Sequence, residues 1–162
     1  MPLPQRKSPR LAEYDYNSNG VYFLTFCTDN MEKLLGEIVG GDAFVAPQMQ
    51  LSEYGKIVEE YILSTNRLAY AKIINYVVMP NHVHLLVQID SDKSIADTGK
   101  PHAAVPHVIA TIKRFCTQKI GTNIFQKSFH DHVVRTQEDF LRIWEYIDNN
   151  PLRWKIDRFY VE

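Results

Sequence analysis

Apolar residues recur along this chain at two spacings, one typical of strands and one typical of helices. Residues 21–28 are rich in aromatic and β-branched side chains and follow Gly20, which predicts a strand. At 37–50 the pair Gly40-Gly41 lies between short apolar runs and indicates a hairpin. Further strands are expected at 73–79, 82–89 and 128–135.

Three segments carry apolar residues at helical spacing. The first begins after Ser52, a residue type favoured at the N-cap, and its apolar positions run over 54–62. The second spans 105–116. The third opens at Thr136 and continues to about Asn149. The order of elements predicts an α+β fold, a sandwich with helices on one face of a mainly antiparallel sheet.

Composition indicates one ordinary globular domain over residues 1–162. The chain has 18 Lys and Arg against 19 Asp and Glu, a formal charge of −1, and 45% of its residues are hydrophobic. Two cysteines exclude a disulfide scaffold and a cysteine-rich zinc module. No apolar run approaches the ~18 residues of a membrane span, so we expect no membrane contact and a cytoplasmic location.

The charge is unevenly distributed. Residues 1–20 form a basic N-terminal arm, and residues 102–162 carry 9 basic and 7 acidic side chains, whereas the middle of the chain is acidic. On charge alone these small excesses are more simply explained as solvated surface, but any contact with a polyanion would use the arm and the last third. Residues 90–101 are polar and rich in turn-forming types, and we expect them to form a flexible loop.

The sharpest candidate for chemistry is the His-x-His pair of the strand at 82–89. Residues two apart in a strand point to the same face, so His82 and His84 would lie side by side while Val83 and Leu85 pack on the other face. Two adjacent imidazoles can bind a metal ion, although two partly exposed strand histidines remain an alternative. A second such pair, His130 and His132, has polar neighbours and is the weaker candidate.

The third helix offers a second candidate. Its apolar stripe is formed by Phe140, Ile143, Trp144 and Ile147, and Tyr146 lies beside that stripe. Asn150 is four residues further on, so both side chains project from one flank of the helix. A tyrosine and a carboxamide at this spacing could present a nucleophile and a metal ligand together, or the tyrosine could simply lie at the edge of the core.

Six segments, in order, make the chain resemble the single-tyrosine transposases of the HUH superfamily, in particular the REP-associated tyrosine transposases. They are residues 6–16, 20–28, 76–84 (YVVMPNHVH), 105–115, 129–135 (FHDHVVR) and 146–154 (YIDNNPLRW). The resemblance implies a ferredoxin-like fold close to that of RNA-recognition modules. It also implies an enzyme that cleaves and rejoins single-stranded DNA near hairpins through a 5′-phosphotyrosine.

Within that resemblance, Tyr146 would be the nucleophile, and His82, His84 and Asn150 would bind Mg²⁺ or Mn²⁺. The ion would polarise the scissile phosphate, which a high-pKa phenol needs. The partner would be hairpin or single-stranded DNA, consistent with a nucleoid-associated protein. Some relatives form dimers that exchange the tyrosine helix, so a homodimer is left open.

Basic and aromatic side chains of the arm and the last third would contact the DNA. Lysine and arginine neutralise phosphates, and aromatic rings stack on unpaired bases. The candidates are Arg10, Tyr14, Tyr16, Lys113, Arg114, Lys119, His132, Arg153, Trp154, Lys155 and Arg158.

Two other functions compete with this one. A zinc-dependent hydrolase could use His82, His84 and either His130 or His132, but it would leave Tyr146 and Asn150 without a role. A non-catalytic or domesticated protein could bind hairpin DNA on the same scaffold. A covalent protein–DNA adduct separates the three, because only the transposase forms one.

Overall fold

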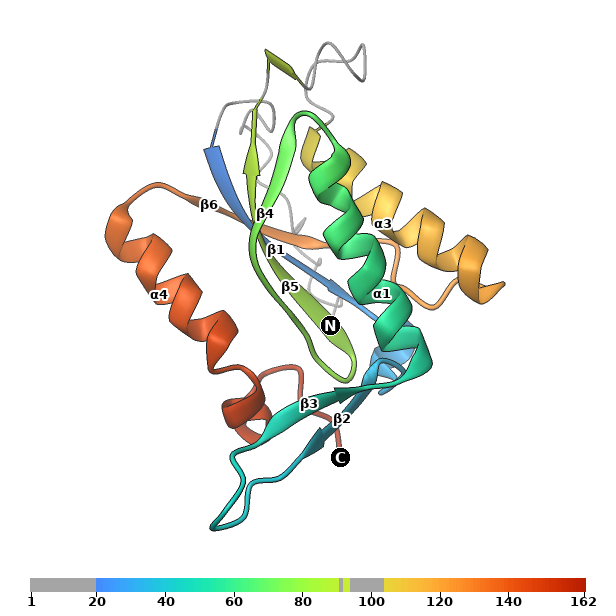
Figure 1. Ribbon diagram of the computed structural model, residues 1–162, viewed down its shortest axis with the longest axis vertical. Coiled ribbons are helices and arrows are strands. Elements are labelled where there is room, and N and C mark those ends of the chain that lie inside the picture. Colours follow the sequence, from blue (N-terminus) through green and yellow to red (C-terminus); the bar gives the residue numbers. More distant parts are fainter. Residues whose placement is uncertain (1–19, 91, 94–103) are drawn as a thin grey trace, which may run out of the picture.

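A four-stranded antiparallel sheet forms the centre of the molecule (Figure 1). The structure, a computed structural model, describes residues 20–90, 92–93 and 104–162. In the sheet the strands follow the order β4-β5-β1-β6, with bounds β1 Gly20–Cys27, β4 Ala71–Val78, β5 His82–Ile89 and β6 His130–Val134. The predicted hairpin is a separate two-stranded sheet of β2 (Gly36–Val39) and β3 (Gln48–Leu51).

Within the described residues, three long helices lie around the sheet. They are α1 (Glu53–Ser64), α3 (Ala104–Ile120) and α4 (Gln137–Asp148), and the short 3₁₀ helices are η1 (Asp29–Met31), η2 (Thr65–Arg67) and η3 (Pro151–Ile156). The path β1-α1-β4-β5-α3-β6 with this strand order is the ferredoxin-like arrangement. The predicted fold class is therefore confirmed.

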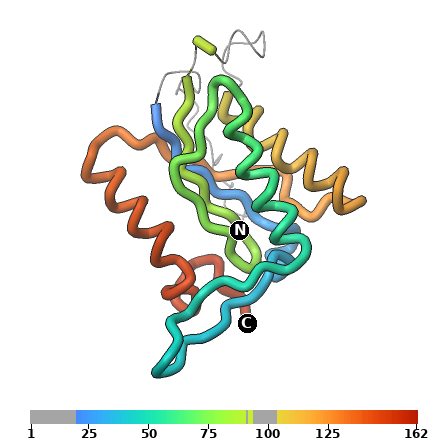
Figure 2. Tube along the Cα trace, viewed as in Figure 1, coloured from blue at the N-terminus to red at the C-terminus, as the bar shows by residue number. Residues whose placement is uncertain are grey.

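The helices divide between the two faces of the sheet (Figures 1 and 2). On one face, buried residues of α1 and α3 such as Val58 and Ile109 share a core with Val83 and Leu85 of β5. On the other face, Ile143 and Ile147 of α4 pack against Leu86 of β5. The expectation of helices on one face holds for α1 and α3 only; α4 covers the opposite face because its apolar stripe matches a second, smaller core there.

The helix starts follow the capping residues that the sequence indicates. The side chain of Ser52 accepts a hydrogen bond from the backbone N–H of Gly55, and the side chain of Thr136 accepts one from that of Asp139. After α4 and η3 the chain turns back toward the β4–β5 turn (Figure 2). There Asn81 Nδ2 donates to the backbone oxygen of Phe159 at 2.8 Å. This return brings the C-terminal residues to the end of the sheet where β5 begins.

Some expectations fall on residues outside the described ranges. These are the basic arm over residues 1–19 and most of the polar loop expected at 90–101. Among the helices that the structure describes, none has the length and apolar character needed to cross a membrane.

Candidate functional site

His82 and His84 lie buried on the face of β5 that α4 covers. The exposed fractions of the two side chains are 0% and 1%. Their alternation with Val83 and Leu85, which belong to the main core on the other face, is the one that the sequence predicts. The two rings are neighbours, with centroids 4.6 Å apart. The histidine pair is therefore enclosed rather than partly exposed on a strand surface.

Each ring is oriented through its Nδ1 atom. Asn81 Nδ2 donates to the backbone oxygens of Met31 and Phe159, which leaves Asn81 Oδ1 to accept from His82 Nδ1 at 2.8 Å. Nδ1 of His84 lies 2.6 Å from the hydroxyl oxygen of Thr25. Nε2 of both rings is buried without a hydrogen-bond partner. Orientation of one ring nitrogen by a hydrogen bond, with the other left free, is typical of histidines that bind metals.

Burial also sets the protonation state of the pair. It lowers the pKa of His82 from 6.5 to about 4, against the opposing influence of the Asp157 carboxylate. Burial lowers the pKa of His84 well below 6.5, and the neighbouring His82 adds to the effect. Both imidazoles are therefore neutral near pH 7, which is the form that coordinates metal ions.

The end of α4 brings Tyr146 and Asn150 to the histidines. The ring centroid of Tyr146 is 5.2 Å from that of His84, and its hydroxyl donates to Asp157 Oδ2 at 3.3 Å. Asn150, 1% exposed, donates through Nδ2 to the same oxygen at 3.0 Å, while its Oδ1 is buried without a partner. Burial raises the pKa of Tyr146, with a further contribution from Asp157, so the phenol keeps its proton. Structure and sequence thus agree on the shared flank of these two residues.

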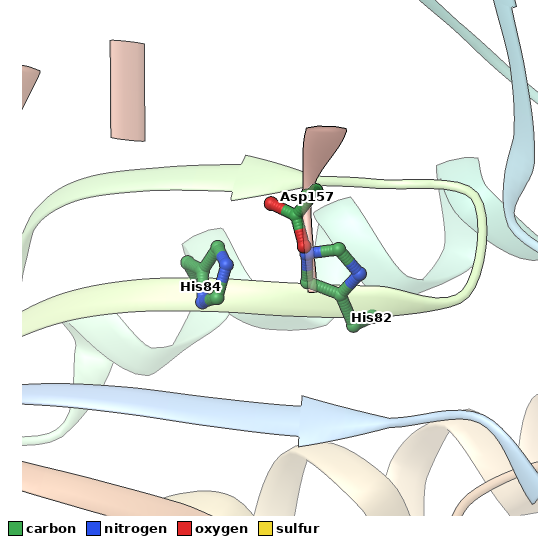
Figure 3. Close-up of side chains that lie close together, drawn as sticks. All are labelled: His82, His84 and Asp157. Carbon is green, nitrogen blue, oxygen red and sulfur yellow. The ribbon is translucent and has the colours of Figure 1, made fainter. Parts of the chain in front are cut away.

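Asp157 completes the cluster and was missed by the sequence reasoning. One ligand atom from each of Asp157, His82 and His84 lies within 4.8 Å of the others, and Figure 3 shows the carboxylate above the His82 ring. Asp157 follows η3, whose turn reverses the chain. No motif or periodicity marks an acid at this position, so only the three-dimensional path reveals it.

The donor atoms of this cluster fit a divalent cation. Two neutral imidazole nitrogens and one amide oxygen are buried and unpartnered, and a carboxylate lies beside them. Amide and carboxylate oxygens suit Mg²⁺ or Mn²⁺, and imidazoles are common ligands of transition-metal ions. Unpaired buried polar atoms cost free energy, so the presence of three of them in residues that gather around Asp157 favours a site built to receive a ligand.

A cavity of about 550 Å³ opens beside Tyr146. Phe23 and His84 form part of its wall, and Arg142, Arg153 and Arg158 supply positive charge around it. Guanidinium groups bind phosphate oxygens in pairs of hydrogen bonds. The cavity therefore places Tyr146 beside a surface suited to a phosphodiester chain.

The predicted DNA contacts near this cavity have different surroundings. Arg153 and His132 line it, but His132 Nε2 is already 2.6 Å from Asp139 Oδ2. Among the described residues, the acidic or imidazole group that lies with His82 and His84 is Asp157, not His130 or His132, which the zinc-hydrolase alternative would use. Lys155 lies in a separate cleft between the β2–β3 hairpin and η3. Trp154 is only 7% exposed and packs near His82, so its ring is not open for stacking on a base as expected.

The basic residues of α3 lie away from the cluster. Lys113, Arg114 and Lys119 belong to the helix that covers the other face of the sheet. Lys113 Nζ donates to the backbone oxygens of Gln126 and Ser128, at 2.7 and 3.1 Å, so it ties two segments together rather than facing the cavity. Arg10, Tyr14 and Tyr16 lie outside the described residues.

Comparison with known proteins places the chain in a protein family. Residues 47–150 match the family model described as "Transposase IS200 like", a range that contains His82, His84, Tyr146 and Asn150 but ends before Asp157. An uncharacterized protein of Haemophilus influenzae is 29% identical over 178 residues, which cover 99% of this chain and 96% of that protein. Among solved structures, a REP-associated tyrosine transposase bound to a REP hairpin has the same fold. Its TM-score is 0.62 at 21% identity, over 89% of this chain and 73% of that one.

Proposed function

Because the chain belongs to the IS200-like transposase family, we propose that it cleaves and rejoins single-stranded DNA near hairpins, with Tyr146 as the nucleophile. The observation that carries this proposal is the meeting of Tyr146 with the histidine pair and Asn150. The ring of Tyr146 lies against that of His84 at one end of the sheet. The same cluster contains two neutral imidazoles and the unpartnered amide oxygen of Asn150. A protein that only binds DNA has no need of that arrangement.

His82, His84 and Asn150 would hold the divalent cation, Mg²⁺ or Mn²⁺, through the three unpartnered atoms. When bound, the cation would withdraw charge from the scissile phosphate and thereby lower the barrier to attack. The chain's own contribution is orientation: Thr25 and Asn81 fix the rings, and α4 holds the phenol at their side. The pKa of Tyr146 is raised, so the phenol is not activated by early loss of its proton. Its contribution to the rate comes instead from being held in position before the reaction begins.

The chemical step is a transesterification. The phenol oxygen of Tyr146 attacks phosphorus, the bond from phosphorus to the 3′ oxygen breaks, and the phenol proton is lost as the 3′-hydroxyl gains one. The product is a 5′-phosphotyrosine with the same number of ester bonds, so a 3′-hydroxyl can reverse the reaction on the same or another strand. No nucleotide hydrolysis is required.

The arginines around the cavity would guide the strand. Arg153 and Arg158 line the cavity beside Tyr146 and would pair with phosphates of the strand. Arg142 also lines it, but its guanidinium contacts Asp139. The relative with the same fold is bound to a REP hairpin, and we extend a hairpin preference and a REP-associated role to this chain. DNA is the partner, in keeping with a cytoplasmic, nucleoid-associated enzyme.

All groups of the site come from one chain. Tyr146 of α4 lies against His84 of β5 within the same molecule. This favours cleavage by the tyrosine of the same subunit, and a homodimer is not needed to complete the site.

The test is a covalent-adduct assay with single-stranded oligonucleotides from the flanks of the gene, each containing a hairpin. With Mn²⁺ or Mg²⁺, a 3′-labelled strand is expected to become attached to the protein, and a 5′-labelled strand to yield a shorter free fragment. Tyr146→Phe should abolish the adduct, whereas Tyr54→Phe, on α1 across the sheet, should not. Binding without an adduct under either ion would support the non-catalytic alternative and overturn the proposal.

A further inference from the structure

We propose that Asp157 is a positioning residue that holds both the attacking phenol of Tyr146 and the cation-facing amide of Asn150. The inference rests on the proposed function and deepens it. Asp157 lies seven residues beyond the segment that matches the family model, so that match assigns it nothing.

One carboxylate oxygen makes both contacts. Asp157 Oδ2 accepts from the Tyr146 hydroxyl at 3.3 Å and from Asn150 Nδ2 at 3.0 Å. A carboxylate only accepts hydrogen bonds, so it attracts the NH₂ end of the amide and repels the oxygen end. The oxygen Oδ1 of Asn150 is therefore turned away from Asp157 and left buried without a partner, available to a cation. Asp157 thus decides which atom of Asn150 is presented.

Asp157 is itself firmly held. Its Oδ1 accepts from the backbone N–H of Phe159 at 2.8 Å, its own N–H donates to the oxygen of Trp154 at 3.0 Å, and its backbone oxygen accepts from the N–H of Tyr160 at 3.0 Å. These bonds form a tight turn rather than a loose chain end. A side chain on such a turn can position others because its own freedom is already restricted.

The same turn is attached to the histidine pair. The backbone oxygen of Phe159 accepts a hydrogen bond from Asn81, the residue that orients His82. The centroids of the Phe159 and His82 rings are 4.5 Å apart. Asn81 therefore connects the ring orientation of His82 to the position of the turn that carries Asp157. One network of hydrogen bonds thus connects His82, the amide of Asn150 and the phenol of Tyr146.

The contacts of Asp157 predict how much cation affinity is lost when its carboxylate is removed. Groups that orient metal ligands from the outer shell typically change metal affinity about 10–100-fold when they are removed. Asp157 also adds a negative charge within 4.8 Å of ligand atoms of both histidines. Loss of the carboxylate should weaken cation binding and, independently, release the phenol from its place beside His84.

The first measurement is Mn²⁺ binding to the DNA-free protein by isothermal titration calorimetry. Asp157→Ala is expected to bind Mn²⁺ about 10–100-fold more weakly than wild type. Asp157→Asn, which keeps one acceptor oxygen, should lose less. Glu162→Gln removes an exposed carboxylate from the same C-terminal segment and should leave the affinity unchanged. Circular dichroism and thermal unfolding establish that each variant is folded, and Asp157→Asn carries the test if Asp157→Ala is not.

The second measurement is the rate of adduct formation in a single turnover at saturating Mn²⁺. We expect the rate of Asp157→Ala to stay at least about 10-fold below wild type, because saturation restores the cation but not the hold on Tyr146. Full recovery of the rate would overturn the role toward Tyr146. Unchanged Mn²⁺ affinity, or no Mn²⁺ binding by the wild type, would overturn the role toward Asn150.

The two proposals fail differently. A wild-type protein that binds Mn²⁺ but forms no adduct contradicts the proposed function, while the calorimetric comparison of the Asp157 variants still decides whether Asp157 positions Asn150. An adduct of normal rate in Asp157→Ala at saturating Mn²⁺ contradicts the role of Asp157 toward Tyr146 and leaves the proposed function standing.

Discussion

Thr25 on β1 lies opposite His84 on β5 in the antiparallel register, and its hydroxyl oxygen is 2.6 Å from Nδ1 of that ring. The pairing of the two central strands therefore determines which nitrogen of His84 faces the site. A slip of one residue in this register would place a core residue opposite His84 and remove the contact. The pairing of β1 with β5 thus orients one of the proposed cation ligands.

Thr25→Val tests this relationship. The substitution keeps the side-chain shape but leaves Nδ1 of His84 buried without a partner, which should lower the free energy of unfolding by about 1–3 kcal/mol. Mn²⁺ affinity should fall about 10-fold or more because the ring loses its orientation. Thr65→Val is the matched control, since Thr65 is also buried but bonds to Tyr61 on α1. Equal Mn²⁺ affinity in the two variants would contradict the role of Thr25.

The metal-free protein should lose stability in mild acid. The pKa of His82 is lowered to about 4 and that of His84 is also lowered, whereas both titrate near 6.5 in the unfolded chain. Between pH 6.5 and about 4 the unfolded state therefore binds more protons than the folded state, and the free energy of unfolding falls as pH falls. The full slope is about 1.4 kcal/mol per pH unit for each histidine.

Urea unfolding of the metal-free protein at several pH values between about 7 and 5 measures this slope. His82→Gln removes one of the two titrating groups, so its free energy of unfolding should depend less steeply on pH. A slope identical to that of wild type would mean that His82 is not a buried neutral imidazole.

Mixing two inactive variants tests whether the nucleophile acts within its own chain. Tyr146→Phe lacks the phenol, and His84→Ala lacks a cation ligand. Because Tyr146 and His84 meet within one chain, the mixture should form no more adduct than the separate variants. Restored adduct formation would show that two chains exchange α4 and share a site.

Substitution of Lys113 should affect stability and substitution of Arg153 should affect DNA binding. Lys113→Ala removes two hydrogen bonds to backbone oxygens and should lower the free energy of unfolding by about 1–3 kcal/mol with little change in DNA affinity. Arg153→Ala should leave stability unchanged but weaken binding of single-stranded DNA, and the slope of affinity against salt should fall by about 1. The opposite pattern would place the DNA path over α3.

Local sequence patterns predicted most of the elements. The two-residue period placed His82 and His84 on one face, and the four-residue spacing placed Tyr146 and Asn150 on one flank, because both relations depend only on the local backbone. The Ser52 and Thr136 caps are equally local and are confirmed.

Contacts between segments far apart in the chain could not be predicted from the sequence. An apolar stripe on α4 shows that the helix packs, but not on which face of the sheet, because both faces of β5 carry groups that need cover. Asp157 reaches the site only because η3 reverses the chain, and Lys113 is held by backbone oxygens of residues that follow α3. Such contacts depend on tertiary packing rather than on periodicity.

Mass spectrometry of the protein after reaction with hairpin-containing single-stranded DNA and Mn²⁺ tests most directly whether Tyr146 is the nucleophile. Cleavage with trypsin and nuclease should leave a nucleotide on the peptide 143–153, in which Tyr146 is the sole tyrosine. We expect a phosphodiester-linked nucleotide on Tyr146 and none on any other residue. A nucleotide on a different side chain, or cleaved DNA with no modified peptide, would contradict it.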